Sequence, residues 1–279
     1  MWIIESGSTK SNWVALDDQK VRLETTQQGF NPYHHDRYDL VNMILSFISN
    51  SDGSKSPDSI HHYCAGADDH RRSEVADIWR YKLPFADINV YSDIMALAHG
   101  LTSGEPGWLG ILGTGSNLAH FNGALIDYNI PSLGWMLGDE GSSRDIAKEI
   151  LKRYGRSSFS ENTTQHLKKI LQFDPEKASG QIQDFRVFKE VIDLLADSLS
   201  QIINTEEIKA LAHSRIAIYI DLLPVNETKF SKRIHLTGSI AYFHSSFIEN
   251  YLGKIGYQCL SIDRYPIKSL INYYVNKNQ

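Results

Sequence analysis

The sequence predicts an α/β protein built from two related lobes. The first observation is a pair of strand–turn–strand units with turns rich in glycine and hydroxyl groups: Glu5–Lys10 near the start and Gly113–Asn117 near the middle. The second observation is that short apolar runs alternate with segments of helical periodicity, which is typical of α/β folds. The third is length, because 279 residues suit two compact domains better than one.

The first lobe is expected to span residues 1–104. Its first three strands follow one another through tight turns, and two later strands alternate with helices. The strands are expected at 2–4, 13–16, 21–26, 60–64 and 88–91, and the helices at 39–48, 68–82 and 94–101. Residues 102–106 (TSGEP) gather turn-forming residues and are the best candidate for a linker.

The second lobe is expected to span residues 105–266. Asn122-Gly123 predicts a two-residue hairpin between its second and third strands. A region from about 160 to 225 has no strand pattern and predicts several extra helices, and a last helix at 267–279 is a candidate to pack back on the first lobe. The other elements are expected as strands at 108–112, 118–121, 234–236 and 257–260 and as helices at 143–154 and 243–251.

Composition narrows the class of protein. The formal net charge is −5, which gives no general affinity for nucleic acid. Cys64 and Cys259 are the only cysteines, so we expect neither a disulfide framework nor a metal cluster. This cysteine content fits a reducing compartment. The sequence has neither a signal peptide nor an apolar run of membrane-spanning length, so we expect a cytoplasmic protein without a membrane partner.

The two glycine-rich turns have the chemistry of phosphate-binding sites. Glycine lets the backbone approach an anion closely, and the neighbouring hydroxyls and amides are donors. Glu5 comes just before the first turn and could hold Mg²⁺, directly or through water. The alternative is an ordinary pair of hairpins, because glycine, serine and threonine favour turns in any case. Neither turn has the spacing of a Walker A loop or of the dinucleotide fingerprint.

Three further segments place polar residues between a strand or loop and a helix. Asp93 follows a strand and opens a helix, so it is either a helix N-cap or a general base. Gly138–Ser142 carries two adjacent acids between glycines, which suit either the helix dipole or the hydroxyl groups of a sugar. Gly238-Ser239 after an apolar strand could either pack against an adenosine or simply start a helix.

Taken together, these segments resemble a known family. Ile4–Lys10, Gly29–Pro32, Ser92-Asp93, Leu112–Asn117 and Leu137–Ser142 occur in the order and spacing of N-acetylglucosamine kinase-like proteins. Those proteins belong to the BadF/BadG/BcrA/BcrD ATPase group of the actin–hexokinase–Hsp70 superfamily. The resemblance spans nearly the whole chain and implies two ribonuclease-H-like, actin-like ATPase lobes with ATP in an interlobe cleft and the sugar deeper in it.

The resemblance also implies roles for single residues. Asp93 would be the catalytic base that takes the proton from the sugar hydroxyl, and Glu5 would hold Mg²⁺. ATP and its phosphates would contact Gly7, Ser8, Thr9, Lys10, Thr114, Gly115, Gly238 and Ser239. The sugar would contact Asn31, Ser116, Asn117 and Asp139. The sequence departs from the family where Glu5 replaces a more common aspartate and where serines replace two glycines of the first turn.

The resemblance therefore implies an ATP-dependent sugar kinase that uses ATP and Mg²⁺. Its expected partner is a small amino sugar, and its expected reaction converts N-acetylglucosamine to the 6-phosphate. A homodimer is common in the family. Two alternatives remain: an activator-type ATPase of the same family, which would hold a [4Fe–4S] cluster through cysteines, and a non-catalytic sensor of a sugar or nucleotide.

Overall fold

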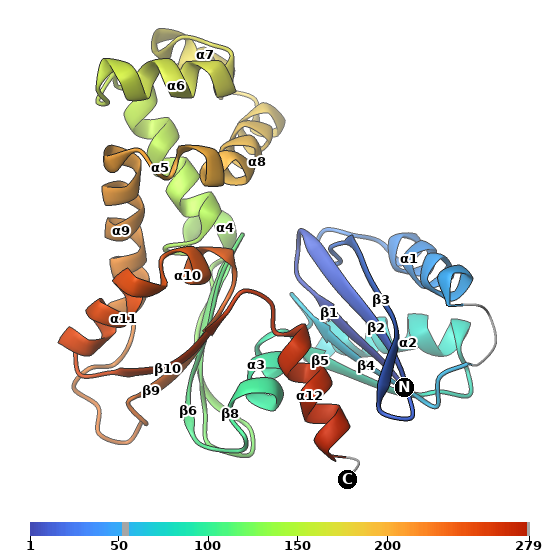
Figure 1. Ribbon diagram of the computed structural model, residues 1–279. Helices are drawn as coiled ribbons and strands as arrows, with labels where there is room; N and C mark the ends of the chain where they lie inside the picture. Colours follow the sequence, from blue (N-terminus) through green and yellow to red (C-terminus); the bar gives the residue numbers. More distant parts are fainter. Residues whose placement is uncertain (52–55, 278–279) are drawn as a thin grey trace. The chain divides into compact units, whose positions relative to one another are not determined.

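The computed structural model describes residues 1–51 and 56–277 (Figure 1). The chain forms two compact units. The first comprises Met1–Leu109, Phe121–Ile126 and the segment from Tyr265 onward, and the second comprises Gly110–His120 and Asp127–Arg264. The lobe boundaries inferred from the sequence stay predictions, and the last two residues of the helix expected at 267–279 lie outside the described residues.

The first sheet has five strands in the order β3-β2-β1-β4-β5. Strands β1, β2 and β3 pair antiparallel, whereas β1, β4 and β5 pair parallel. All five strands include the ranges that the sequence predicts, and each extends beyond its range. Their bounds are Trp2–Ser6, Lys10–Asp17, Lys20–Gln28, Ser59–Cys64 and Asp87–Ser92 for β1 to β5.

Helices cover both faces of the first sheet. On one face, Trp2 and Ile4 of β1 pack with Phe47 and Trp79 from two helices, and the rings of Trp2 and Phe47 meet edge to face at 4.9 Å. On the other face, the C-terminal helix packs against β1 and a third helix. Burial on both faces explains why β1 is apolar at consecutive positions. The helices are α1 (Arg37–Asn50), α2 (Asp69–Lys82), α3 (Ile94–Leu101) and α12 (Ile267–Lys277).

The second sheet repeats the plan of the first. Its order is β10-β9-β6-β7-β8, which is the order of the first sheet when β6 to β10 are matched with β1 to β5. Strands β9 and β10 pair parallel. The duplication predicted from the two glycine-rich turns is therefore confirmed in the topology. The bounds are Gly107–Leu112, Ser116–Phe121, Ile126–Ile130, Arg233–Thr237 and Gln258–Asp263 for β6 to β10.

The second unit carries the extra helices. Between residues 160 and 225, all of which the structure describes, the regular elements are helical, as the sequence predicts. Helix α5 packs against α8 and α9, and α6 packs against α8 (Figure 1). The bounds are Gly134–Leu137 (α4), Ser143–Gly155 (α5), Glu161–Leu171 (α6), Ala178–Gln181 (α7), Phe185–Ile202 (α8), Glu206–Ile220 (α9), Ser239–Phe243 (α10) and Ser245–Lys254 (α11).

Two local predictions were wrong. The turn at Asn122 is not a two-residue hairpin, because the Asn122 side chain accepts hydrogen bonds from the amides of Ala124 and Leu125, each at 3.0 Å, and widens the loop to four residues. The single helix expected at 243–251 is divided at His244, whose φ of −111° lies outside the helical range.

Across the part of the chain that the structure describes, every helix is either too short or too polar to cross a lipid bilayer.

Candidate functional site

The first group of predicted site residues lies at one edge of the first sheet. Strands β1, β4 and β5 run parallel, and the register places Ser6 beside Cys64 and Cys64 beside Ser92. The chain that follows each of these residues must therefore emerge at the same edge. This brings the β1–β2 turn and Asp93 together at the carboxyl ends of parallel strands, where ligand sites of α/β sheets gather.

The β1–β2 turn is held by its own backbone and by a second loop. The Gly7 amide donates to the Lys10 carbonyl at 3.0 Å, and the Gly29 amide donates to the Thr9 carbonyl at 3.0 Å. A Cβ at Gly29 would lie 2.3 Å from the Gly7 oxygen. Only glycine therefore allows the loop that begins at Gly29 to lie directly on the turn.

Asn31 joins that loop to the turn. Its Nδ2 donates to Ser8 Oγ at 3.1 Å, and its Oδ1 accepts from the Tyr33 amide at 2.9 Å. A Cβ at Gly66 would lie 2.4 Å from Asn31 Oδ1, so this buried side chain is enclosed from two sides. The structure thus brings a predicted sugar ligand, Asn31, against a predicted phosphate ligand, Ser8.

Glu5 combines partial burial with a second nearby acid. Its Oε2 accepts from Asn12 Nδ2 at 2.8 Å. The pKa of the Glu5 carboxyl is raised to about 7, mainly by burial and also by the charge of Asp93, whereas the Asn12 hydrogen bond and the Lys10 charge oppose the shift. Mg²⁺ is typically held by one or two carboxylates together with water and phosphate oxygens, so Glu5 is a candidate to hold one such ion at this edge.

Asp93 is the N-terminal cap of α3. Its Oδ1 accepts from the Ile94 amide at 2.9 Å. The capping role that the sequence suggested is therefore confirmed. A carboxylate offers about four lone-pair sites, so this cap remains compatible with the role of a base.

The second group of predicted residues follows β6. The Gly113 amide donates to the Gly115 carbonyl at 2.9 Å and closes the β6–β7 turn. A Cβ at Gly115 would lie 3.0 Å from Asp139 Oδ2. Gly115 therefore leaves the room that the Asp139 carboxylate occupies, which places the second predicted phosphate turn beside a predicted sugar ligand. Thr114 lies between the two glycines, and the Asn117 side chain accepts from the Leu118 amide at 2.9 Å.

Asp139 has an unusual backbone conformation. Its φ is +55°, and its side chain is held by the Ser132 hydroxyl at 3.1 Å and by the Ser116 amide. The residue is only 9% exposed, and burial raises the pKa of its carboxyl. Ser142, not an acid, caps α5. A strained, buried acid that does not cap the helix favours the ligand interpretation over the dipole interpretation.

Gly238 lies against the β6–β7 turn. Its φ is +113°, and a Cβ there would lie 2.4 Å from the Leu112 carbonyl oxygen. Its amide donates to the Asp263 carbonyl at 3.1 Å, and Ser239 is the first residue of α10. The predicted adenosine turn and the second predicted phosphate turn are therefore in direct contact.

Sequence reasoning missed a pair of side chains next to Gly238. Phe243 ends α10 with 56% of its surface exposed, and the Arg264 guanidinium lies 5.0 Å from the centre of its ring. Arg264 directly follows β10, which runs parallel to β9. The signal available in the sequence was the position of an arginine just past the carboxyl end of a strand.

Other side chains bear on the chemistry. Lys10 Nζ lies 4.3 Å from the centre of the Tyr265 ring. Cys64 is fully buried in β4, and burial raises the pKa of its thiol. Within residues 1–51 and 56–277, no group of three or more histidine, cysteine, aspartate or glutamate side chains is arranged to hold a metal ion.

Comparisons with known proteins show the fold. No family model matches the chain, and no curated protein matches it. Among solved structures, a proposed N-acetylglucosamine kinase from Porphyromonas gingivalis is similar over 100% of both chains, with 24% identity and a TM-score of 0.86. A proposed N-acetylglucosamine kinase from Chromobacterium violaceum is similar over 98% of both chains, with 16% identity and a TM-score of 0.65.

A ROK hexokinase from Thermus thermophilus is also similar, over 99% of this chain and 98% of the hexokinase, with 12% identity and a TM-score of 0.56. The predicted fold class is confirmed: the chain has the α/β fold of actin-like ATPases, with two five-stranded mixed sheets, each flanked by helices.

Proposed function

We propose that this chain is an ATP-dependent sugar kinase that phosphorylates an amino sugar. The observation that carries the proposal is the position of Asp93, which directly follows the parallel strand β5 and lies near Glu5 and the β1–β2 turn. The same edge holds the groups that phosphate, a cation and a hydroxyl nucleophile require. The names of the similar solved proteins add support, and the resemblance of the motifs favours the BadF/BadG/BcrA/BcrD group.

In this proposal, Asp93 does the acid–base work. Its carboxylate orients the acceptor hydroxyl and takes the proton as that oxygen bonds to the γ-phosphorus. The bond from the γ-phosphorus to the bridging oxygen breaks, and ADP leaves with the bond electrons. Phosphoryl transfer depends mainly on positioning and charge stabilisation, and a positioned base typically contributes about 10²- to 10⁴-fold in rate.

In this proposal, ATP contacts the residues that the sequence predicts as its ligands. Backbone amides and hydroxyls of the two glycine-rich turns bind the phosphates, and the adenine ring of ATP stacks near Phe243 and Arg264. The phosphate ligands are Gly7, Ser8, Thr9, Lys10, Thr114 and Gly115, and the adenosine ligands are Gly238 and Ser239. Glu5 would hold one Mg²⁺, directly or through water, and the ion would offset the charge of the phosphates.

In this proposal, the sugar is bound through polar side chains. The proposed ligands are Asn31, Ser116, Asn117 and Asp139. The direct contacts of Asn31 with Ser8 and of Asp139 with Gly115 support this assignment, because each links a sugar ligand to a phosphate turn. We propose N-acetylglucosamine as the substrate and its 6-phosphate as the product, in line with the names of two similar proteins.

The activator-type alternative gains no support from the cysteines. Cys64 is fully buried within the first sheet, and its thiol has a raised pKa, which is unfavourable for a cluster ligand that must be a thiolate. Asp93 favours the kinase over the sensor, whereas the serines that replace glycines of the first turn favour the sensor. The experiment below decides between them.

The test is ADP release with Mg²⁺-ATP and a panel of sugars. We expect release to depend on N-acetylglucosamine and to be weak with glucose, and we expect mass spectrometry to find phosphate on the 6-hydroxyl. Tight binding of the sugar without ADP release would favour the sensor. Release that no sugar stimulates, from folded protein, would contradict the proposal.

A further inference from the structure

Helix α9 belongs to the extra helices that the kinase proposal leaves without a role. It nevertheless contacts both segments that supply sugar ligands in the second unit. Arg215 and Tyr219 lie one helical turn apart, so their side chains leave the same face of α9. Tyr219 makes a direct polar contact with one of the two segments, and Arg215 is linked to the other through Asp145.

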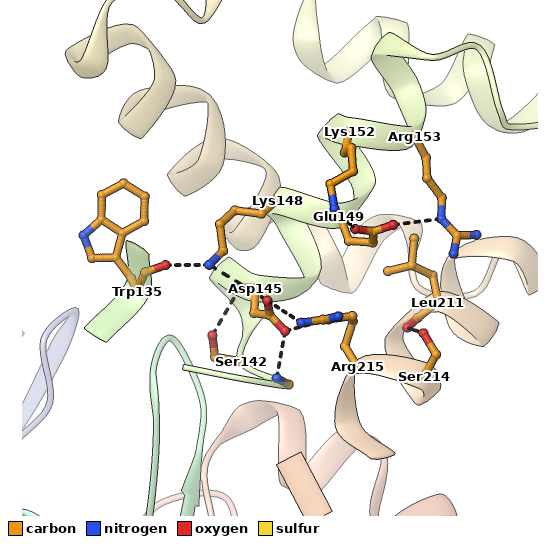
Figure 2. A network of polar contacts seen from close by, with 11 residues as sticks. Trp135, Ser142, Asp145, Lys148, Glu149, Lys152, Arg153, Leu211, Ser214 and Arg215 are labelled. Atoms are coloured by element: carbon orange, nitrogen blue, oxygen red, sulfur yellow. Dashed lines mark hydrogen bonds and ion pairs between the residues drawn. The ribbon is translucent and has the colours of Figure 1, made fainter. Parts of the chain in front are cut away.

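Arg215 holds the segment that carries Asp139. Its Nε donates to Asp145 Oδ2 at 2.8 Å and its Nη2 donates to Asp145 Oδ1 at 3.0 Å (Figure 2). The same Oδ2 accepts from the Gly141 amide at 2.9 Å. Gly141 is two residues from Asp139, so a two-bonded arginine on α9 fixes the turn through one carboxylate.

The packing of Gly141 shows how closely the turn lies on α9. A Cβ at Gly141, where φ is +72°, would lie 3.0 Å from Tyr219 Cβ and 3.2 Å from the Arg215 carbonyl oxygen. The turn thus rests on the backbone of the helix and not merely on its side chains. Any shift of α9 must be transmitted to the turn, because close-packed backbones cannot give way independently.

Tyr219 holds the other segment. Its hydroxyl donates to the Asn117 carbonyl at 3.0 Å, and the side chain is 2% exposed. A Cβ at Gly110 of β6 would lie 2.4 Å from the Tyr219 hydroxyl oxygen. Glycine at this position therefore leaves the space that the hydroxyl occupies. The hydroxyl therefore reaches across β6 to the residue that follows Ser116 on β7.

The energetics fit positioning better than stabilisation. An ion pair as buried as Asp145–Arg215 gains little net stability over apolar residues of similar size, because both charges lose water. Its bidentate geometry does fix orientation. A backbone hydrogen bond also fixes orientation here. The Ser143 amide donates to the Gly113 carbonyl at 2.8 Å and joins the start of α5 to the β6–β7 turn.

We propose that α9, through Arg215 and Tyr219, positions the two sugar-binding segments Ser116-Asn117 and Gly138–Ser142 relative to each other. This inference rests on the proposed sugar-kinase function. Arg215 and Tyr219 are positioning residues, since both act through other residues. The extra helices then serve to keep the acceptor ligands of the second unit at a fixed spacing.

The test uses Tyr219→Phe and Arg215→Lys in the full chain. Phenylalanine removes only the hydroxyl, and lysine keeps the charge but loses the two-bonded geometry. We expect each change to raise the KM for the sugar by about tenfold while the KM for ATP changes by less than about twofold. The double variant should fall short of the product of the two effects, because both residues hold one assembly.

The matched control is Tyr257→Phe. Tyr257 is also buried and its hydroxyl also donates to a backbone carbonyl, that of Pro224 at 3.3 Å, away from both segments. A purely structural role of Tyr219 would make Tyr219→Phe behave like this control, with a lower melting temperature and an unchanged KM for the sugar.

Amide hydrogen exchange gives a readout that needs no activity. Peptides covering residues 114–118 and 138–143 should exchange faster in Tyr219→Phe and Arg215→Lys than in wild type or Tyr257→Phe. Unchanged exchange in those peptides, or an unchanged KM for the sugar in both variants, would overturn the inference. If wild type shows no sugar-dependent turnover, the kinase proposal fails, and the exchange rates still decide whether α9 holds the two segments.

Discussion

Replacing Glu5 by glutamine should stabilise the protein much more above pH 7 than at pH 5. Burial raises the pKa of Glu5 from 4.5 to about 7 in the folded chain. A raised pKa means that the folded state prefers the protonated acid. Below its unfolded pKa, Glu5 is protonated in both states and does not lower the free energy of unfolding. Its cost appears as the pH rises from about 4.5 and is complete above about 7.

The magnitude follows from the difference between the two pKa values. About 2.5 pH units at about 1.4 kcal/mol per unit give about 3.5 kcal/mol as an upper limit. Water reaches part of this side chain and screens it, so we expect about 2 kcal/mol. Glutamine keeps an oxygen that can accept from Asn12 Nδ2 and carries no charge, which isolates the cost of ionisation.

The assay is urea unfolding at a series of pH values between 5 and 8.5, in buffer that contains EDTA. Tryptophan fluorescence reports on the first unit, because Trp2, Trp13 and Trp79 all lie in its core. The control is Glu24→Gln, which changes an exposed acid on the same sheet. A difference between Glu5→Gln and wild type that stays constant over this pH range would refute the reasoning.

Three further predictions concern the second unit. Gly238→Ala places a Cβ against the Leu112 carbonyl at a positive φ and should lower the free energy of unfolding by about 2 to 4 kcal/mol. Gly253→Ala is the control, because a Cβ there meets open space and should not lower the free energy of unfolding. Equal urea midpoints for the two variants would contradict this prediction. Arg264→Ala should raise the KM for ATP several-fold without changing the calorimetric affinity for the sugar. An unaltered KM for ATP would show that Arg264 does not contact the adenine. Asp139→Ala should weaken sugar binding by at least about tenfold, since a charge-assisted hydrogen bond is lost; wild-type affinity in calorimetry would show that the sugar is not held there.

Local patterns predicted the elements that position the site. The strand pattern at Ile60–Cys64 and the turn chemistry around Gly113 act within a few residues, so the sequence contains their full signal. The place of Asp93 also followed from the sequence, because an acid just past a parallel strand must lie at the ligand edge of the sheet. Its action as a base stays a prediction.

Contacts between distant residues could not be predicted in the same way. The Asp145–Arg215 pair spans 70 positions, and the requirement for glycine at Gly238 comes from the backbone of Leu112 on another strand. Nothing in the periodicity of α9 distinguishes Arg215 from the other charged residues of that helix. Such contacts depend on how helices and strands pack, which hydrophobic spacing restricts but does not determine.

The most direct test of the central claim compares wild type with Asp93→Asn. Asparagine is nearly isosteric and keeps an oxygen that can accept from the Ile94 amide, so the α3 cap and the fold should survive. We predict that sugar-dependent ADP release falls by about 10²- to 10⁴-fold while calorimetric affinity for the sugar stays close to wild type. Turnover near the wild-type rate in this variant would contradict the assignment of Asp93 as the base.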